Sequence, residues 1–438
     1  MINHNLPKNW EVKTLGECLE YEQPTKYIVK NTQYSDEYEI PVLTAGKSFL
    51  LGYTNDTENI FTQTPVIIFD DFTTDSKFVD FHFKVKSSAM KILHATKIAD
   101  IKFVFYFMQT IQYRSDTHKR YWISEYTKLP IPLPPLEVQK AIVEKLENAF
   151  AHIDEAVRHL KAVQTNIPRL KSSLLHCAFS GKLTESQNQL REVQTLKSVV
   201  GVEGEFEREE GATSRSFRKK LAQTCTFKPL RPLIKAEIPQ GWEIKTLGEI
   251  FLIERGGSPR PIKEYLTDDE SGINWIKIGD TKDISKYIFT TTQKIKLEGK
   301  KYSRFVEVGD LILSNSMSFG KPYIMKTTGC IHDGWVVLRQ SKKVIDEEFA
   351  YYILISNEIY AEFNRLATGS TVKNLNIDRI KQIQIPLPPL ETQKQIVQIL
   401  ESKFAHLEKL AQFVNASLEN LQRLKSSLLN QAFKGELV

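Results

Sequence analysis

Apolar residues recur three and four positions apart along two long stretches of the chain, which is the spacing of one buried helix face. Each stretch follows a proline, Pro135 or Pro389, which suits a first helical turn whose amides lack intrahelical partners. A glycine near each end, Gly181 or Gly435, is typical of the left-handed residue that ends a helix. The pattern predicts two helices of about 45 residues with a coiled-coil seam. The seam residues are Val143, Leu146, Phe150, Ile153, Val157, Leu160 and Ile167, then Val397, Leu400, Phe404, Leu407, Val414, Leu418 and Leu421.

The two long stretches are copies of each other. Residues 131–183 match residues 385–437 without a gap at 29 of 53 positions. A short tag is duplicated as well, because residues 6–17 and 238–249 are identical at 8 of 12 positions. Between tag and helix, the two halves differ in both sequence and length. The duplication predicts one scaffold, present twice, that carries two different inserts.

The inserts alternate between apolar and polar positions, which predicts strands. Such runs are VIIFD, KFVDFHFKV, GDLILS and WVVLR, beginning at residues 66, 77, 309 and 335. Each insert then ends in a helical pattern, over residues 101–114 and 347–366. The inserts are therefore predicted to be two mixed α/β heads.

A coiled-coil seam on one chain can pair in two ways. It can form a homodimer with a second chain, or the two copies can pair with each other as antiparallel helices. We favour pairing within the chain, because the linked copies have a high effective concentration for one another. Residues 184–237, in which acidic EFEREE precedes basic RSFRKK, are predicted to be a linker.

Composition excludes several classes of protein. The net charge of +6 permits a nucleic-acid partner without requiring one. The sequence has neither an apolar run long enough for a membrane span nor a signal peptide, so we expect a cytoplasmic protein without a membrane partner. The four cysteines have no zinc-ligand spacing, which predicts no metal site.

Motifs for catalysis are also missing from the sequence. A methyltransferase acting on a nucleobase amino group would have an Asn/Asp-Pro-Pro-aromatic loop and a glycine-rich cofactor turn, and neither occurs in the sequence. The single GKS at 46–48 lacks the first glycine of a phosphate-binding loop, because Pro41 stands there. We therefore predict a protein with no catalytic residues and no cofactor.

Short polar loops with basic and aromatic neighbours are the candidate DNA-binding positions. Lys and Arg can contact phosphates, while Ser, Thr and Asn can reach base edges. In the first head the candidates are Lys47, Ser48, Thr73, Thr74, Lys77, Lys84, Lys86, Lys119, Arg120 and Tyr121. In the second head they are Arg255, Ser258, Arg260, Lys301, Arg304, Ser314, Asn315, Ser316, Ser370, Thr371, Lys373 and Asn374. Ordinary solvated loops have similar compositions, so that each loop alone decides little.

Taken together, the chain resembles the specificity subunit of type I restriction-modification systems. The resemblance rests on the two IPLPPLExQKxIV helix openings, the RLKSSLL and AFxGxL endings and the two W-E-x-K-T-L-G-E tags. It also rests on NWIKIGD and ATGSTVKNLNIDRIKQIQIPLPP in the second head. The first head departs from the family pattern, since THKRYWISEYTKLPIPLPP stands where the second head has its more typical segment.

The resemblance implies two globular α/β target recognition domains held apart by antiparallel helices, in a pseudo-twofold molecule. The implied boundaries are 1–130 and 238–384 for the two domains, 131–183 and 385–438 for the helical spacers, and 184–237 for the linker. Its implied partners are double-stranded DNA, two methyltransferase subunits and ATP-dependent restriction subunits. Val143, Phe150, Val397 and Phe404 are expected to be buried in the helix pair or against the methyltransferase.

Two other classes compete with this interpretation. The chain could be a coiled-coil scaffold whose inserts bind proteins, or an enzyme with an unrecognised site in one insert. A scaffold has no need of two different folded inserts on nearly identical stems. An enzyme has no need of duplicated stems.

Overall fold

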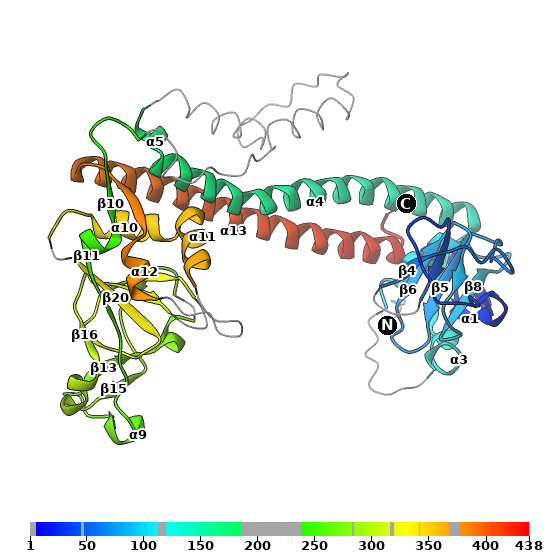
Figure 1. Cartoon of the computed structure of the whole chain (residues 1–438). Coiled ribbons are helices and arrows are strands. Elements are labelled where there is room, and N and C mark those ends of the chain that lie inside the picture. The colour runs from blue at the N-terminus through cyan, green and yellow to red at the C-terminus, as the bar shows by residue number, and fades with distance from the viewer. Residues whose placement is uncertain are drawn as a thin grey trace. The chain divides into compact units, whose positions relative to one another are not determined.

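A computed structural model describes residues 6–44, 48–111, 120–185, 238–282, 284–315, 319–340, 342–367 and 376–437. The fold is of mixed α/β class and divides into two compact units. Unit 1 comprises Met1–Val163 and Phe413–Val438, and unit 2 comprises Gln164–Gln412. Each unit therefore holds one head and a part of both long helices (Figure 1). Among the described residues, no helix combines the length and the apolar composition that a bilayer crossing needs.

The two long helices form where the apolar periodicity predicts them. Helix α4 spans Leu136–Phe179 and continues through Pro168, and helix α13 spans Leu390–Lys434. Gly181 and Gly435 end them with φ of +78° and +76°, which confirms the predicted left-handed caps. A short helix, α5 (Lys182–Glu185), follows α4.

The long helices contact each other within each unit and run in opposite directions. In unit 1, Lys425 Nζ lies 2.6 Å from Asp154 Oδ1. In unit 2, Lys171 Nζ lies 3.0 Å from Glu408 Oε2. Such exposed ion pairs contribute little stability, so that the apolar contacts between the helices and the heads carry most of it.

The first head contains two sheets and a strand pair. The antiparallel pair joins the duplicated tag to the start of the helical repeat. One sheet has the strand order β2-β8-β5-β6 and the other β4-β3-β7. The strands are β1 (Glu11–Thr14), β2 (Leu19–Glu22), β3 (Ile40–Leu43), β4 (Leu50–Thr54), β5 (Val66–Asp70), β6 (Ser76–Val79), β7 (Lys84–Val85), β8 (Met90–Ala95) and β9 (Pro130–Leu133). The helices are α1 (Leu15–Cys18), η1 (Pro24–Tyr27), α2 (Ile101–Met108), α3 (Tyr121–Ser124) and η2 (Tyr126–Lys128).

The second head repeats this plan with additional strands. Its sheets have the orders β11-β20-β17-β18-β14 and β12-β15-β13-β19-β16, and β10 pairs with β21. The strands are β10 (Glu243–Thr246), β11 (Phe251–Arg255), β12 (Leu266–Thr267), β13 (Ile273–Ile276), β14 (Tyr287–Ile288), β15 (Gln293–Ile295), β16 (Arg304–Val306), β17 (Leu311–Ser314), β18 (Pro322–Met325), β19 (Gly329–Ile331), β20 (Trp335–Gln340) and β21 (Gln384–Leu387). The helices are α8 (Leu247–Ile250), α9 (Ile262–Tyr265), η4 (Ile278–Thr281), η5 (Leu297–Tyr302), α10 (Glu347–Leu354), α11 (Asn357–Leu366) and α12 (Ile377–Lys381).

The strand pairings make the two heads equivalent although their sequences differ. The antiparallel series β2-β8-β5-β6 corresponds to β11-β20-β17-β18, and the parallel pair β3–β7 corresponds to β13–β19. The sequence comparison did not reveal this, because a sheet position requires an apolar side chain more than a particular one.

Two predicted elements are divided in the structure. The run KFVDFHFKV is split between β6 and β7, which belong to different sheets. The helical pattern over 347–366 is split into α10 and α11 at Ser356, whose buried hydroxyl donates to Ile353 O at 2.7 Å and caps α11. A buried serine that bonds its own backbone in this way favours a helix start over a helix interior.

One buried glutamine ties each head to the start of its long helix. Gln139 accepts a hydrogen bond from Asp100 N at 2.7 Å and donates to Ile98 O and Pro134 O at 3.0 and 2.8 Å. Gln393, at the matching repeat position, makes the same three bonds: 2.7 Å from Asp346 N, 3.1 Å to Val344 O and 2.8 Å to Pro388 O. Both glutamines are fully buried, so that each one fixes a joint between head and helix.

Aromatic side chains complete the joint around helices α2 and α10. Phe103 of α2 packs edge-on against Phe433 at 5.1 Å between ring centroids. Phe349 of α10 packs in the same way against Phe179 at 5.4 Å. Each head is thus held by the start of one long helix and by the end of the other.

Replacing Gln393 by methionine is expected to weaken this joint in unit 2. Methionine fills a similar volume but leaves Asp346 N, Val344 O and Pro388 O without their partner, at about 1–3 kcal/mol for an unsatisfied buried group. Hydrogen exchange at residues 344–346 and 388–393 should accelerate. The control is Gln395→Met on the exposed face of the same helix, and equal exchange in the two variants would contradict the proposed role of the joint.

Candidate nucleic-acid interface

In each head one short turn joins the two sheets, and this connecting turn is the centre of the candidate interface. It comprises residues 86–89 between β7 and β8 and residues 332–334 between β19 and β20. The first residue of the turn donates its backbone N–H to the end of the neighbouring parallel strand. These bonds join Lys86 to Leu43 O at 2.9 Å and His332 to Ile276 O at 3.4 Å.

The last residue of the connecting turn accepts a hydrogen bond from the first residue of a hairpin loop. This hairpin loop follows β5 in the first head and β17 in the second. Asp71 N donates to Ala89 O at 3.4 Å in the first head, and Asn315 N donates to Gly334 O at 2.8 Å in the second. The loops that contain several candidate DNA-binding residues therefore meet at equivalent places in both heads. Loops gathered at one end of a rigid sheet framework are a common way to build a binding surface.

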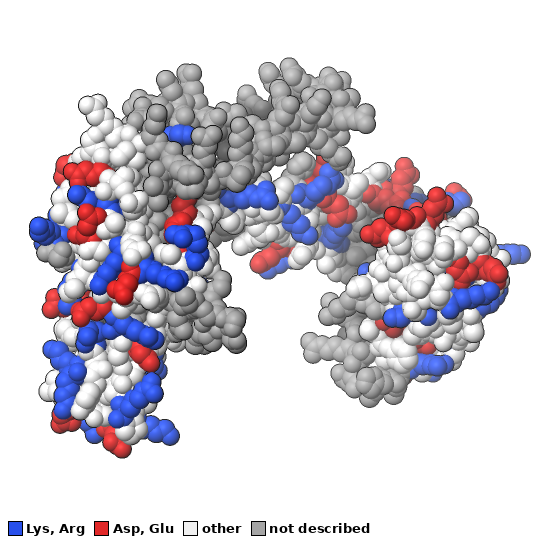
Figure 2. Space-filling view, viewed as in Figure 1, with Lys and Arg blue, Asp and Glu red and all other residues white. Residues whose placement is uncertain are grey.

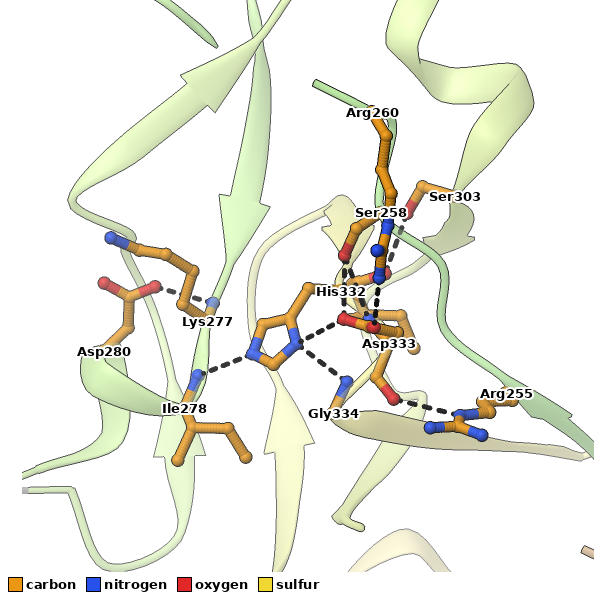
Figure 3. A network of polar contacts seen from close by, with 11 residues as sticks. Arg255, Ser258, Arg260, Lys277, Ile278, Asp280, Ser303, His332, Asp333 and Gly334 are labelled. Atoms are coloured by element: carbon orange, nitrogen blue, oxygen red, sulfur yellow. Dashed lines mark hydrogen bonds and ion pairs between the residues drawn. The ribbon is translucent and has the colours of Figure 1, made fainter. Parts of the chain in front are cut away.

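His332 links the connecting turn of the second head to the loop after β13 (Figure 3). The Ile278 N–H points at His332 Nε2 at 3.1 Å, and the Gly334 N–H points at Nδ1 at 2.8 Å. Burial lowers the pKa of His332 against the opposing influence of Asp333, and this keeps the ring neutral. A neutral imidazole carries a proton on one ring nitrogen, so it can accept from one of these two amides, whereas a protonated imidazole accepts from neither.

Asp333 links the same turn to the loop that follows β11 (Figure 3). The Ser258 hydroxyl donates to Asp333 Oδ1 at 2.9 Å, and Arg260 Nη2 lies 3.5 Å from Oδ2. Arg255 Nε donates to the Asp333 carbonyl at 3.1 Å. Burial tends to raise the pKa of Asp333, but the hydrogen bond from Ser258 and the proximity of His332 outweigh it, so that the pKa is lowered. Asp333 is therefore charged at neutral pH.

Two glycines let the loop after β11 lie directly on the backbone of its neighbours. A Cβ on Gly256 would lie 2.1 Å from the His332 carbonyl oxygen, and one on Gly257 would lie 2.6 Å from the Tyr302 carbonyl oxygen. Neither backbone oxygen can move without displacing a strand end. The two glycines thus allow the backbone of the loop to pack directly against the connecting turn.

Basic side chains surround this loop. The predicted DNA-binding candidates Arg255, Arg260, Lys301 and Arg304 are all exposed. Arg304 Nε lies 3.1 Å from Glu254 Oε1, and Lys301 Nζ lies 4.9 Å from the centroid of the Tyr302 ring. Figure 2 shows Lys and Arg over much of the visible face of the second head, with Asp and Glu between them.

Two candidates of the second head are corrected. Ser314 and Asn315 are buried, so that they support the hairpin loop and offer no surface to DNA. Ser314 Oγ accepts a hydrogen bond from Lys321 N at 2.9 Å. The candidates Ser316, Ser370, Thr371, Lys373 and Asn374 lie outside the described residues.

In the first head, the hairpin loop after β5 is shaped by Asp70. Its carboxylate accepts from Phe72 N at 2.9 Å and from the Thr73 hydroxyl at 2.6 Å, and Thr74 adopts a φ of +66°. Thr73 and Lys77 are exposed, and Thr74 is half-buried.

Asp71 brings a distant segment to the same loop. Its carboxylate accepts from Trp122 N at 2.8 Å, and its carbonyl accepts from Tyr121 N at 3.0 Å. The exposed Arg120, next in the chain to Tyr121, therefore lies beside the hairpin loop. Ser48 and Lys86 are also exposed, in the loop after β3 and in the connecting turn.

Burial corrects two candidates of the first head. Lys84 is 1% exposed, forms an ion pair with Asp56 at 2.9 Å and also donates to the Glu58 carbonyl. Tyr121 is buried in the core of the head. Neither side chain can reach DNA. The candidates Lys47 and Lys119 lie outside the described residues.

The residues expected to be buried in the helix pair or against the methyltransferase pack within their own units. Val143 and Val397 are buried in the cores of their own units. Phe150 and Phe404 are partly buried, against Tyr106 and Tyr352, with 5.6 Å between ring centroids in each pair. The two valines are therefore buried as expected, within the chain, and the alternative that they are buried against the methyltransferase is corrected.

Asp333, His332 and the two buried glutamines are functional candidates that the sequence reasoning missed. The glutamines were visible, since they are identical in both copies of LExQK. The polar triplet HDG between two apolar runs was a weaker signal at 332–334. Among the described residues, no group of three or more His, Cys, Asp or Glu is arranged to hold a metal ion.

Comparison with known proteins places this geometry in a family. Residues 7–163 and 239–420 match the model of the type I restriction modification DNA specificity domain. The chain is 30% identical over 402 residues to the type I restriction enzyme EcoR124I/EcoR124II specificity subunit of Escherichia coli, covering 88% of this chain and 85% of that one. It is 22% identical over 462 residues to the MjaVIII specificity subunit of Methanocaldococcus jannaschii, covering 99% and 94%.

Two solved structures share the fold. One is a chain from a type I restriction-modification system, with a TM-score of 0.63 and 18% identity over 99% of this chain and 100% of that one. The other is the HsdS subunit of Thermoanaerobacter tengcongensis, with a TM-score of 0.55 and 19% identity over 99% and 98%.

Proposed function

The chain belongs to the type I restriction-modification DNA specificity family, and we propose that each of its heads reads one half of a split DNA target. The first head, residues 1–130, and the second head, residues 238–384, are the two target recognition domains. Residues 131–183 and 385–438 are the helical spacers, and residues 184–237 connect the halves. The observation that carries this proposal is the connecting turn, around which equivalent loops meet in two heads of different sequence.

In this function the basic residues provide affinity and the polar loops provide selectivity. Arg255, Arg260, Lys301 and Arg304 are suited to phosphate contacts, which hold a duplex without reading its sequence. Ser258 lies among them in the second head, and Thr73 and Thr74 lie in the hairpin loop of the first head; these hydroxyls can reach base edges or backbone oxygens. The two heads offer different side chains, so the two half-sites should differ.

The helices carry the remaining part of the proposal. They pair as an antiparallel coiled coil in a pseudo-twofold molecule, and their exposed faces dock two adenine methyltransferase subunits. The ATP-dependent restriction subunits join that complex, and the chemistry belongs to these partners rather than to this chain. The ion pairs between α4 and α13 in each unit support the antiparallel arrangement.

Sequencing of DNA methylation in cells that carry this chain and its methyltransferase partner tests the proposal. We expect methylated adenines in a split, asymmetric motif. Exchange of residues 18–128 for the insert of another family member should change one half-site and leave the other intact. A single continuous palindrome would contradict the proposal.

A further inference from the structure

We propose that Asp333 is a specificity-determining residue of the second head, which holds the Arg255–Arg260 loop for reading and weakens binding to DNA in general. This inference rests on the proposed function, because it assumes that the second head reads a half-site. Asp333 is a positioning residue in this role. It acts through Ser258, Arg255 and Arg260 and does not itself contact a base.

The position of Asp333 is unusual for a surface that binds a polyanion. Its side chain is 47% exposed, and it lies beside the exposed Arg255 and Arg260. A carboxylate there repels phosphate and neutralises part of the charge of Arg260, which is 82% exposed. On electrostatic grounds alone, the head would bind DNA better without it. A compensating role must therefore come from the contacts that the carboxylate makes.

The carboxylate holds the middle and the end of the loop, and the backbone carbonyl of Asp333 holds its start. Arg255, at the start, donates to the Asp333 carbonyl, and Ser258, in the middle, donates to the carboxylate (Figure 3). Arg260, at the end, faces the other carboxylate oxygen. The glycines between them bring the backbone of the loop against the same turn. One aspartate thus holds the three side chains of the loop that can face DNA.

A loop held in one conformation discriminates better than a mobile one. An Arg or Ser that samples many positions can meet a phosphate or a base of any duplex, whereas a fixed one fits only the duplex whose groups match it. Fixing the loop also avoids an ordering cost on binding. Asp333 therefore weakens general binding through its charge and increases the difference between matched and mismatched DNA.

The first head lacks this device, which gives the proposal an internal comparison. Aligning the two heads on the register of their parallel strands makes Lys86 the equivalent of His332, and Ser87 the equivalent of Asp333. Within the described part of the first head, the Ser87 side chain accepts a local bond from Ala89 N at 3.4 Å. Changes at Asp333 should therefore affect the half-site of the second head and leave that of the first head unchanged.

The test measures DNA binding by the chain assembled with its methyltransferase partner, at several salt concentrations. The first probe is an unmethylated duplex with the target sequence that methylation sequencing identifies. The others are duplexes with one base changed in either half-site, and an unrelated duplex. The insert exchange at 18–128 identifies which half-site belongs to the second head. We expect Asp333→Ala to raise affinity for the unrelated duplex roughly threefold or more, with a steeper salt dependence, as a freed arginine gains a phosphate contact.

In the same variant, the ratio of affinities for the matched duplex and for duplexes changed in the second half-site should fall about tenfold. A change of this size is what the loss of one specific base contact causes. Asp333→Asn removes the charge but keeps an oxygen that can accept from Ser258. It should raise general affinity while retaining more of the discrimination than Asp333→Ala. Ser258→Ala leaves the charge unchanged, so we expect it to lower discrimination without raising general affinity.

Glu362→Ala is the matched control. Glu362 is an acid of the same head that pairs with Arg365 at 2.7 Å on α11, an element outside both the connecting turn and the Arg255–Arg260 loop. The Glu362→Ala substitution removes the same charge and frees an arginine. It should leave the discrimination between matched and mismatched DNA as it is in the unchanged chain. Hydrogen exchange in the core strands of the second head shows whether each variant remains folded.

Two results would overturn the inference. One is full discrimination at the second half-site in folded Asp333→Ala, and the other is an equal loss at both half-sites. Failure of the proposed function is a different result, because then the unchanged chain with its partner would show no preference for any split sequence.

Discussion

Phe433→Ala is expected to destabilise unit 1 by about 3–5 kcal/mol, the range for deleting a buried aromatic side chain. Phe433 is buried at the end of α13, and its ring meets Phe103 at 5.1 Å and Phe107 at 5.2 Å in edge-on contacts. Alanine leaves a cavity between the long helix and α2, and it also removes the favourable geometry of the two ring pairs. Denaturant unfolding gives the loss of stability, and hydrogen exchange assigns it to α2 and the end of α13.

Phe413→Ala is the control for this prediction, since Phe413 belongs to the same helix but is 61% exposed. It should change stability by less than about 0.5 kcal/mol, as surface substitutions usually do. Phe179→Ala, at the matching repeat position, should instead destabilise unit 2, where Phe179 meets Phe349. Equal effects of Phe433→Ala and Phe413→Ala would show that the joint at α2 is wrongly described.

Gly256→Ala is expected to remove most of the base discrimination of the second head while the head stays folded. The new Cβ would lie 2.1 Å from the His332 carbonyl oxygen and 2.8 Å from that of Ile331, so the loop must lift away from the connecting turn. Such overpacking costs about 1–3 kcal/mol. The displaced loop would carry Ser258 out of reach of Asp333. Binding of the assembled complex to matched and mismatched duplexes measures the effect.

Gly279→Ala provides the control in the same head. Gly279 lies in the loop after β13, and an added Cβ there would meet none of the described atoms within 4 Å. It should leave binding and discrimination unchanged. If Gly256→Ala discriminates as well as Gly279→Ala, then the loop after β11 does not read DNA.

The long helices could be predicted from the sequence because the signals that define them are local. The apolar spacing, the first-turn prolines and the terminal glycines each act within a few residues, and Gly181 and Gly435 adopt the predicted conformation. Duplication reinforced the prediction, because two copies with the same pattern are unlikely to arise by chance. The buried glutamines follow the same logic, since they repeat with the helices.

The equivalence of the two heads was harder to predict from the sequence, because it lies in the order and pairing of their strands. Helices α2 and α10 share Asp, Phe and Tyr at the same three positions, Asp100, Phe103 and Tyr106 against Asp346, Phe349 and Tyr352. Three residues spaced in this way are too weak a signal to find without the strands that surround them. The sheet order and the connecting turn then depend on pairings between residues far apart in the chain.

The candidate site shows the same limit. Arg255, Ser258 and Arg260 could be selected from the loop composition, but Asp333 is joined to Ser258 across 75 positions. Lys84 could not be recognised as buried, because its partner Asp56 reaches it through tertiary folding. A lysine in a polar segment looks the same whether it faces solvent or an internal carboxylate.

Unit 1 combines the beginning of the chain with its last residues, whereas unit 2 is one continuous stretch. During synthesis, all of unit 2 is translated before Phe433 is made. Until then the face of α2 that carries Phe103 and Phe107 stays uncovered and is an apolar surface for chaperones or aggregation. Translation therefore imposes an order in which the second head can mature first, and a prematurely terminated chain would keep the first head permanently open.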